Sequence, residues 1–153
     1  MKIKLFLAAI TSLLVLCSSL SAGQIMISDA YARSSGPLAK AGAAYMRIMN
    51  HSDESDRLIG VQSDIAKKTE LHTHSKDDNG VMKMVRIDEG IKIGAMKEHS
   101  LIRGGQHVMF MGLTQSLQHG DKITVTLIFE RFGSVKLAIP VDLERTNTMK
   151  HDD

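Results

Sequence analysis

Cysteine is almost absent from this chain of 153 residues. The single one, Cys17, lies in the first 22 residues, which we expect to be removed on export. A mature chain without thiols has no disulfide framework and no thiol nucleophile. It also has no thiolate ligand, which argues against a structural zinc site and against a blue-copper centre. Any metal ion would have to be held by other side chains.

Apolar runs long enough to cross a bilayer are missing too. The apolar segment 5–15 is too short to span one comfortably, and it lies between a short basic start and a stretch rich in serine and alanine. This order predicts a secretory signal peptide over residues 1–22, cleaved near Ala22. A retained membrane anchor is the alternative. A lipid-attached Cys17 is disfavoured, because Leu16 is a poor fit to the small residue that such signals require.

Neither sign of charge is in excess. The full chain has 19 Lys and Arg against 17 Asp and Glu, and removal of Lys2 and Lys4 with the leader leaves 17 against 17. Balanced charge provides no electrostatic footprint for nucleic acid. Aromatic residues make up only 4% of the chain. Together with the missing thiolate, this scarcity disfavours a copper-dependent redox enzyme.

The mature chain reads as short β-segments separated by turns. With no long helical period, this spacing predicts an all-β fold, an antiparallel sandwich or barrel, in one domain over residues 23–145. Residues 39–49 could instead form a helix, and residues 146–153 read as a flexible polar tail. The segments with strand character are 25–32, 41–49, 57–63, 67–73, 81–87, 107–111, 122–130 and 134–141.

Imidazole and thioether side chains alternate in the segment His107-Val108-Met109-Phe110-Met111. Alternate residues of a strand point to one face, so His107, Met109 and Met111 would lie together. Val108 and Phe110 would face the core. Neutral imidazole and thioether ligands suit a soft, low-charge metal ion, above all Cu(I).

An upstream segment has a similar composition. His72 and His74 precede a polar turn, and Met82 and Met84 follow it on what reads as the returning strand of a hairpin. If this segment and the downstream one are neighbours in one sandwich, they can supply two imidazoles and two thioethers to one ion. The sequence therefore predicts a four-ligand metal site without cysteine.

The competing interpretation is a mixture of core and surface residues, because methionine commonly fills irregular gaps in cores. A lone His-x-Met in such a chain would mean little. The residues for which we expect core packing are Met26, Met46, Met49 and Met96, and those for which we expect solvent exposure are His51, His99 and His119.

Segments 70–74 (ELHTH), 80–84 (GVMKM) and 105–113 (GQHVMFMGL) resemble the bacterial periplasmic copper chaperones of the PCuAC family. The resemblance covers nearly the whole mature chain, including residues 30–33 and 42–45. It implies a cupredoxin-like antiparallel β-sandwich that binds Cu(I) and, in some members, Cu(II). From the signal peptide we expect a periplasmic protein with no stable membrane insertion after signal cleavage, and we expect it to be a monomer.

Matched residue by residue, the family pattern implies the copper ligands His72, Met84, His107 and Met109. The 22 residues between Met84 and His107 fit the usual spacing. Between His72 and Met84 there are 11 residues, one more than usual, whereas His74 leaves nine, one fewer. The first ligand is therefore His72 or His74. We favour His72, since an extra residue would most simply enlarge the intervening turn.

The resemblance further implies transport rather than catalysis. Family members are implicated in supplying copper to the CuA centre of cytochrome c oxidase subunit II, often beside a Sco-type protein. The alternative is a copper-buffering or copper-resistance protein without a dedicated acceptor. Four further side chains could assist the ion or have no contact with it, namely Met82, Met111, Met149 and His151.

Overall fold

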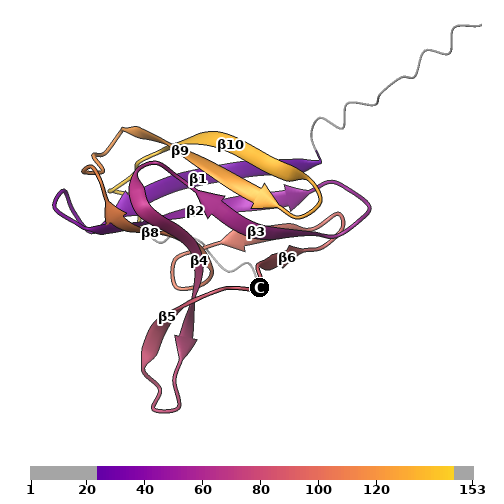
Figure 1. Cartoon of the computed structure of the whole chain (residues 1–153), viewed down its shortest axis with the longest axis horizontal. Coiled ribbons are helices and arrows are strands. Elements are labelled where there is room, and N and C mark those ends of the chain that lie inside the picture. The colour runs from indigo at the N-terminus through magenta and orange to yellow at the C-terminus, as the bar shows by residue number, and fades with distance from the viewer. Residues whose placement is uncertain (1–23, 147–153) are drawn as a thin grey trace, which may run out of the picture.

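The computed structural model describes residues 24–146 and shows two packed β-sheets (Figure 1). The strands are β1 (Ile25–Ser34), β2 (Ala41–Asn50), β3 (Asp56–Gln62), β4 (Ala66–Lys76), β5 (Met82–Arg86), β6 (Ile91–Ile93), β7 (Glu98–Leu101), β8 (His107–Leu113), β9 (Lys122–Phe129) and β10 (Gly133–Pro140). One sheet has the order β1-β2-β8-β4-β5, with β7 also paired to β2, and the other has the order β10-β9-β3-β6. All ladders between these strands are antiparallel.

Alternation along the strands builds the core between the sheets. Val108 and Phe110 of β8 are fully buried, as are Val125 and Leu127 of β9 on the facing sheet. The intervening residues of each strand point away from this layer, as the period of two requires. The predicted all-β antiparallel sandwich is confirmed.

The helix considered for residues 39–49 does not form. Ala44, Met46 and Ile48 are buried on one side of β2, while Arg47 between them is exposed. This period of two suits a strand that packs one face on a core. β2 lies centrally, with ladders to β1, β7 and β8 that satisfy its backbone.

The predicted leader, 1–22, and residues 147–153 of the predicted tail lie outside the described residues. Met149 and His151 are among them. Within the described range there is no helix of the length and apolarity needed to cross a membrane.

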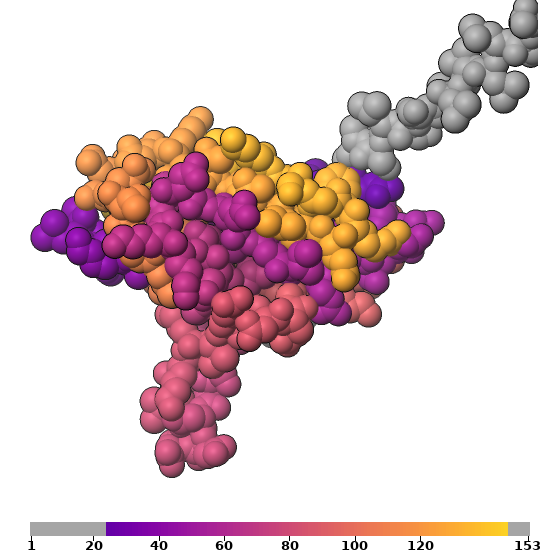
Figure 2. Space-filling model, viewed as in Figure 1, coloured from indigo at the N-terminus to yellow at the C-terminus, as the bar shows by residue number. Residues whose placement is uncertain are grey.

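The hairpin of β4 and β5 projects from the body of the sandwich (Figures 1 and 2). β5 is the last strand of its sheet and is exposed along its whole length. Its turn, residues 77–81, is held by the Asp77 carboxylate, which accepts hydrogen bonds from the backbone N–H groups of Asn79 and Val81 at 3.0 Å each. The hairpin therefore carries its side chains into solvent rather than into the core.

Candidate metal centre

The outer face of the first sheet brings the predicted ligands of β4 and β8 together. His72 pairs directly with His107, and Glu70 pairs with Met109. Residues directly opposite in an antiparallel ladder project from the same face of the sheet. Val108, between the two ligands of β8, is buried on the other face. The predicted alternation of β8 is confirmed, with Val108 and Phe110 toward the core and His107 and Met109 on the other face.

The methionine of β5 joins this face through a different neighbour. Met84 pairs with His74, two residues beyond His72 on β4. The sequence interpretation allowed β5 and β8 to be neighbours, but β4 lies between them. Two strand spacings of about 4.8 Å each therefore separate the backbones of β5 and β8. Met84 is the peripheral member of the group, with 52% of its surface exposed.

His107 is oriented by the main chain of its own loop. Its ring is 1% exposed, and its Nδ1–H donates to the carbonyl oxygen of Gly105 at 2.9 Å. Because a carbonyl only accepts, this bond fixes the neutral tautomer whose Nε2 carries a lone pair. That Nε2 is buried and has no hydrogen-bond partner. A buried imidazole nitrogen with a lone pair is thus left without a partner within the described residues.

His72 shows the same arrangement with its nitrogens exchanged. Its Nε2–H donates to the Glu70 carboxylate at 2.9 Å, while its buried Nδ1 has no partner. The rings of His72 and His107 are 6.2 Å apart between centroids. Metal-binding histidines typically donate their second nitrogen to a carboxylate or a backbone carbonyl, as these two do. Two orphaned, pre-oriented ring nitrogens are the donors that an ion between them would use.

The ring of His74 lies nearer to that of His107 than the ring of His72 does, but its Nδ1 is close to a possible hydrogen-bond partner. Its ring centroid is 5.3 Å from that of His107. Its Nδ1 lies 3.4 Å from the same Gly105 carbonyl oxygen that His107 uses. Ring distance favours His74 and the unpaired nitrogen favours His72. We give the unpaired nitrogen more weight, because a buried polar atom without a partner costs free energy that a ligand can recover.

Glu70 is a residue of this site that the sequence interpretation did not assign a role. Its carboxylate accepts from His72 and forms ion pairs with Arg86 at 3.1 Å and Lys68 at 3.5 Å. The hydrogen bond from His72, with the two cations, holds the pKa of Glu70 below its usual value. The position of Glu70 two residues before His72, on the same strand face, was the signal that could have identified it.

Burial sets the protonation state of His107. Desolvation lowers the pKa of its ring, the hydrogen bond to Gly105 acts against this, and the neighbouring His74 and His72 lower the pKa further. The ring of Tyr45, on β2, lies 6.2 Å from that of His107 and closes this side of the site. The neutral imidazole, the form that binds metals, is therefore favoured at physiological pH.

The thioethers on this face differ in position. Met109 is half-buried between Ala43 of β2 and Glu70 of β4, beside His107 on the same strand face. Met111 is four residues from His107, about 13 Å along the strand, and is paired with Lys68. Met82 is opposite Lys76 near the hairpin tip. By position, Met109 is the thioether nearest the two orphaned nitrogens.

The described part of the chain contains no group of three or more His, Cys, Asp or Glu side chains placed to hold a metal ion. The other donors that this face offers to an ion include the thioethers of Met109 and Met84. Such a mixed set favours a soft ion over zinc, magnesium or calcium.

Several other histidines and methionines differ from expectation. Core packing of Met46 is confirmed, whereas Met26 and Met96 are 50% and 59% exposed, so their predicted packing is wrong. His99 is partly buried and hydrogen-bonded to Gln106 at 2.7 Å instead of being solvent-exposed. The exposure expected of His51 and His119 is confirmed.

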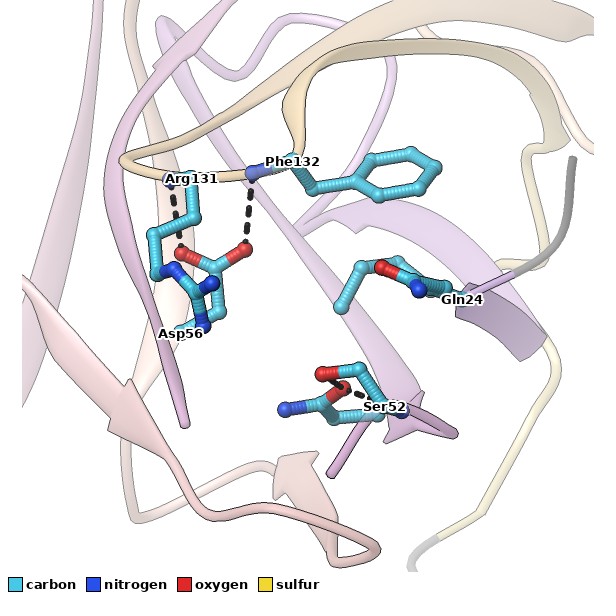
Figure 3. A pocket seen from close by; sticks show the side chains of 7 residues that line it. Gln24, Ser52, Asp56, Arg131 and Phe132 are labelled. Carbon is cyan, nitrogen blue, oxygen red and sulfur yellow. Dashed lines mark hydrogen bonds between the residues drawn. The ribbon is translucent and has the colours of Figure 1, made fainter. Parts of the chain in front are cut away.

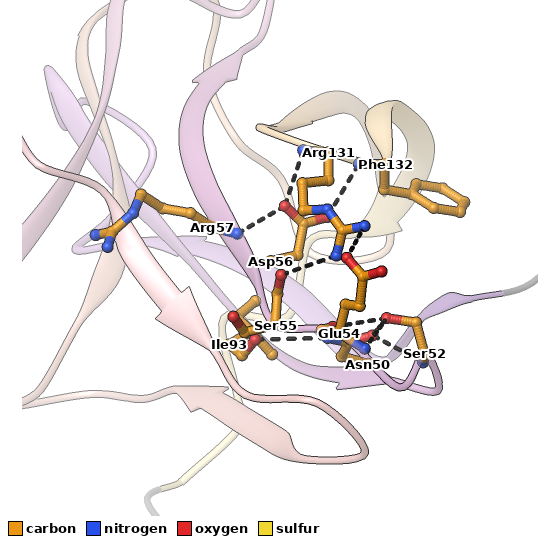
Figure 4. Close-up of polar contacts among 9 residues, drawn as sticks. All are labelled: Asn50, Ser52, Glu54, Ser55, Asp56, Arg57, Ile93, Arg131 and Phe132. Carbon is orange, nitrogen blue, oxygen red and sulfur yellow. Dashed lines mark hydrogen bonds and ion pairs between the residues drawn. The ribbon is translucent and has the colours of Figure 1, made fainter.

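A polar hollow of about 90 Å³ lies at one end of the sandwich (Figure 3). Its Asp56 carboxylate accepts hydrogen bonds from the backbone N–H groups of Arg57, Arg131 and Phe132 (Figure 4). The side-chain amide of Asn50 is bonded on both sides, donating to Glu54 O and accepting from Ser52. These hydrogen bonds hold the loops together, so a structural role accounts for Asp56 and Asn50 in the lining of the hollow.

Sequence comparison places this chain among known relatives. The family model "Putative lipoprotein LpqE-like" matches residues 25–141. "Putative lipoprotein Lxx21020" of Leifsonia xyli subsp. xyli is 31% identical over 117 residues, which are 76% of this chain and 69% of that protein.

Solved structures agree. The copper-bound PCuAC domain from PmoF2 is 26% identical, with a TM-score of 0.66 over 79% of this chain and 94% of that one. The CuI form of DR1885 from Deinococcus radiodurans is 32% identical, with a TM-score of 0.58 over 75% of this chain and 76% of that one. The predicted cupredoxin-like β-sandwich is confirmed. The chain belongs to the LpqE-like family, the family of the PCuAC domains.

Proposed function

We propose that this protein carries Cu(I) as cargo on the outer face of its first sheet, held by His72, His107, Met109 and Met84. The observation that carries the proposal is the pair of orphaned ring nitrogens, His72 Nδ1 and His107 Nε2, on directly opposed residues. Each ring is already oriented through its other nitrogen. Copper-bound relatives of the same fold support the choice of ion.

The chemistry of the donors favours the reduced ion. Thioethers and neutral imidazoles bring no negative charge, and they need not lose a proton to bind. They can therefore capture and release Cu(I) without thiol exchange. The absence of cysteine from residues 23–153 suits an oxidising compartment, where free thiols are readily consumed. Cu(II) is a second oxidation state that the imidazoles could accept.

The exposure of Met84 suits transfer rather than storage. Met84 is half-exposed on a hairpin that projects from the body, whereas His107 is buried at the base of the site. A ligand of an acceptor protein can approach from the Met84 side while the imidazoles still hold the ion. We propose that the acceptor is the CuA domain of cytochrome c oxidase subunit II, with a Sco-type protein as partner, and that delivery takes place in the periplasm after removal of residues 1–22.

The decisive experiment is transfer from the Cu(I)-loaded protein to an apo CuA-domain acceptor. We expect loading of the acceptor to be faster from the protein than from the same concentration of Cu(I) in a weak chelator. Equal loading from both sources would contradict the chaperone function and favour copper buffering. X-ray absorption of the loaded protein should count two nitrogen and two sulfur neighbours.

A further inference from the structure

A second group of thioether and imidazole side chains lies on the first sheet, away from the proposed site. It consists of Met26 on β1, Met49 on β2, His51 just after β2 and Met96 just before β7. We call these four residues the pole cluster. None of them is part of the site formed by β4, β5 and β8.

The ladders of β2 place these residues side by side. Met26 pairs directly with Met49 in the β1–β2 ladder, so the two side chains share a face. His51 continues the same face two residues further on, and its N–H donates to the carbonyl of Gln24, which extends the ladder. The cluster therefore begins as two adjacent thioethers with an imidazole one step beyond.

Met96 reaches the group from the other side of β2. The N–H of Asn50 donates to the carbonyl of Lys97 at 3.0 Å, which extends the β2–β7 ladder beyond its last assigned pair. Beyond this pair the register shifts by one residue, so Met96 lies beside Ser52, the residue after His51. The N–H of Met96 donates to the carbonyl of Ser52 at 3.0 Å and fixes the segment there. The four side chains thus occupy neighbouring positions on three strands or strand extensions.

Core packing does not explain these residues. Met26 and Met96 are at least half-exposed and His51 is exposed, while Ile25 and Asn50 take the buried positions between them. An exposed methionine leaves apolar surface in contact with water, which a polar residue at the same position would not do. Three exposed soft-ligand residues and the partly buried Met49 therefore lie at neighbouring positions of the first sheet.

The backbone conformation of Met96 is a further sign that this methionine is not placed there for packing. Its φ is +52°, in the left-handed region that favours glycine or asparagine. Here a long side chain occupies that conformation at a turn in which the Lys97 N–H donates to the carbonyl of Gly94. The fold alone would be better served by a smaller residue. An exposed methionine is therefore kept at a strained position, beside Ser52 and next to His51 along the chain.

We infer that the pole cluster binds a second soft monovalent cation, Cu(I) or its analogue Ag(I), through thioether sulfur and the imidazole of His51. All four ligand groups are neutral, which disfavours hard divalent ions. Glu98, which is opposite Met49 in the β2–β7 ladder, forms an ion pair with Arg47 at 3.7 Å. The ion would be more exposed than in the first site and would exchange more readily.

The two sites are separate. Met49 lies four residues along β2 from Tyr45, the neighbour of His107, which is about 13 Å in a strand. One ion cannot be shared over that length. The inference is therefore independent of the proposed function, and it can be tested in a protein that lacks the first site.

The test is a titration of the mature protein carrying His107→Ala and Met109→Ala with Ag(I), followed by NMR of ¹³C-labelled methionine methyl groups. We expect the methyl signals of Met26, Met49 and Met96 to shift together and to saturate. The methyl signal of Met46, buried in the core, is the internal control and should not move. Unmoved signals from all three cluster methionines would overturn the inference.

Variants then separate binding from folding. Replacement of Met26, Met49 and Met96 by leucine, which nearly conserves volume, should weaken this Ag(I) binding at least tenfold. The same should hold for His51→Ala but not for the matched control His119→Ala, which is also an exposed histidine. Undiminished binding in the leucine variant would overturn the inference. If that variant does not fold, Met96→Asn alone should weaken Ag(I) binding while raising the melting temperature. Unchanged Ag(I) binding in this single variant would also overturn the inference.

Discussion

His72 and His107 lie directly opposite each other on β4 and β8, and each has one buried ring nitrogen without a hydrogen-bond partner. The partner of the other nitrogen is a carboxylate for His72 and a main-chain carbonyl for His107. The orientation of both rings therefore exists before any ion arrives. An ion that binds there need not meet the free-energy cost of ordering them.

Removal of either ligand of β8 should weaken copper binding strongly. We expect His107→Ala and Met109→Ala each to lower Cu(I) affinity at least tenfold, about 1.4 kcal/mol. Competition titration against a Cu(I) chelator measures the change, and His119→Ala serves as the control. If both variants kept the wild-type Cu(I) affinity, the assignment of His107 and Met109 as copper ligands would be contradicted.

The first ligand can be decided by comparing two single variants. His72→Ala removes a ring with an unpaired buried nitrogen, whereas His74→Ala removes a ring whose Nδ1 lies 3.4 Å from the Gly105 carbonyl. We therefore expect the larger loss of Cu(I) affinity from His72→Ala, by about tenfold or more. The same chelator competition applies. A larger loss from His74→Ala would reverse the assignment.

Glu70 should matter for copper without touching it. Glu70→Gln replaces the carboxylate that accepts the His72 Nε2–H, so the ring loses its charged partner. Partners of this kind typically affect metal affinity by about 10–100-fold, and we expect a value near the lower end. Circular dichroism should show an intact fold. The outcome that contradicts this role is an unchanged affinity in a folded variant.

His107 should make the copper-free protein less stable in acid. Burial lowers the pKa of its ring below the ordinary value of 6.5, which the unfolded chain retains. As the pH drops below 6.5, His107 takes up a proton in the unfolded state but not yet in the folded state. The free energy of unfolding therefore falls with pH until the pH is below the pKa of the folded state. Urea unfolding at pH 7.5 and 5.5 should show this loss. His107→Gln should lose less stability over the same interval, and an equal loss would refute the effect.

Asp56 should affect stability but not copper. Its buried carboxylate accepts backbone hydrogen bonds from Arg57, Arg131 and Phe132 at 2.7–3.0 Å. Asp56→Ala leaves these donors unpaired, and we expect the free energy of unfolding to fall by about 3 kcal/mol. Chemical denaturation measures it, with the exposed Asp64→Ala as control. A loss no greater than that of the control would show that water replaces the carboxylate.

The strands of this fold could largely be predicted from the sequence, because most are long enough to show alternation. β2 and β9 begin where expected. The missed strands β6 and β7 have three and four residues, too few to establish a period. The position of β4 between β5 and β8 could not be predicted, because pairing of distant segments leaves no local pattern.

The ligand types of the candidate site were visible in the sequence, but their surroundings were not. Tyr45 closes the site from β2, more than 60 positions before His107, a proximity that only the folded sheet creates. The exposed methionines Met26 and Met96 were misassigned, because hydrophobicity alone predicts burial. Their place at a sheet edge, beside other soft ligands, depends on register.

The two halves of the candidate site tolerate changes in chain length very differently. A residue inserted at the tip of the β4–β5 hairpin, beyond the Lys76–Met82 pair, leaves His72, His74 and Met84 on their face. One inserted within β8 would instead rotate the ligands into the core and the core residues outward. Among relatives, the distance from the first histidine to its methionine can therefore drift, while the His-x-Met of β8 must remain a fixed length.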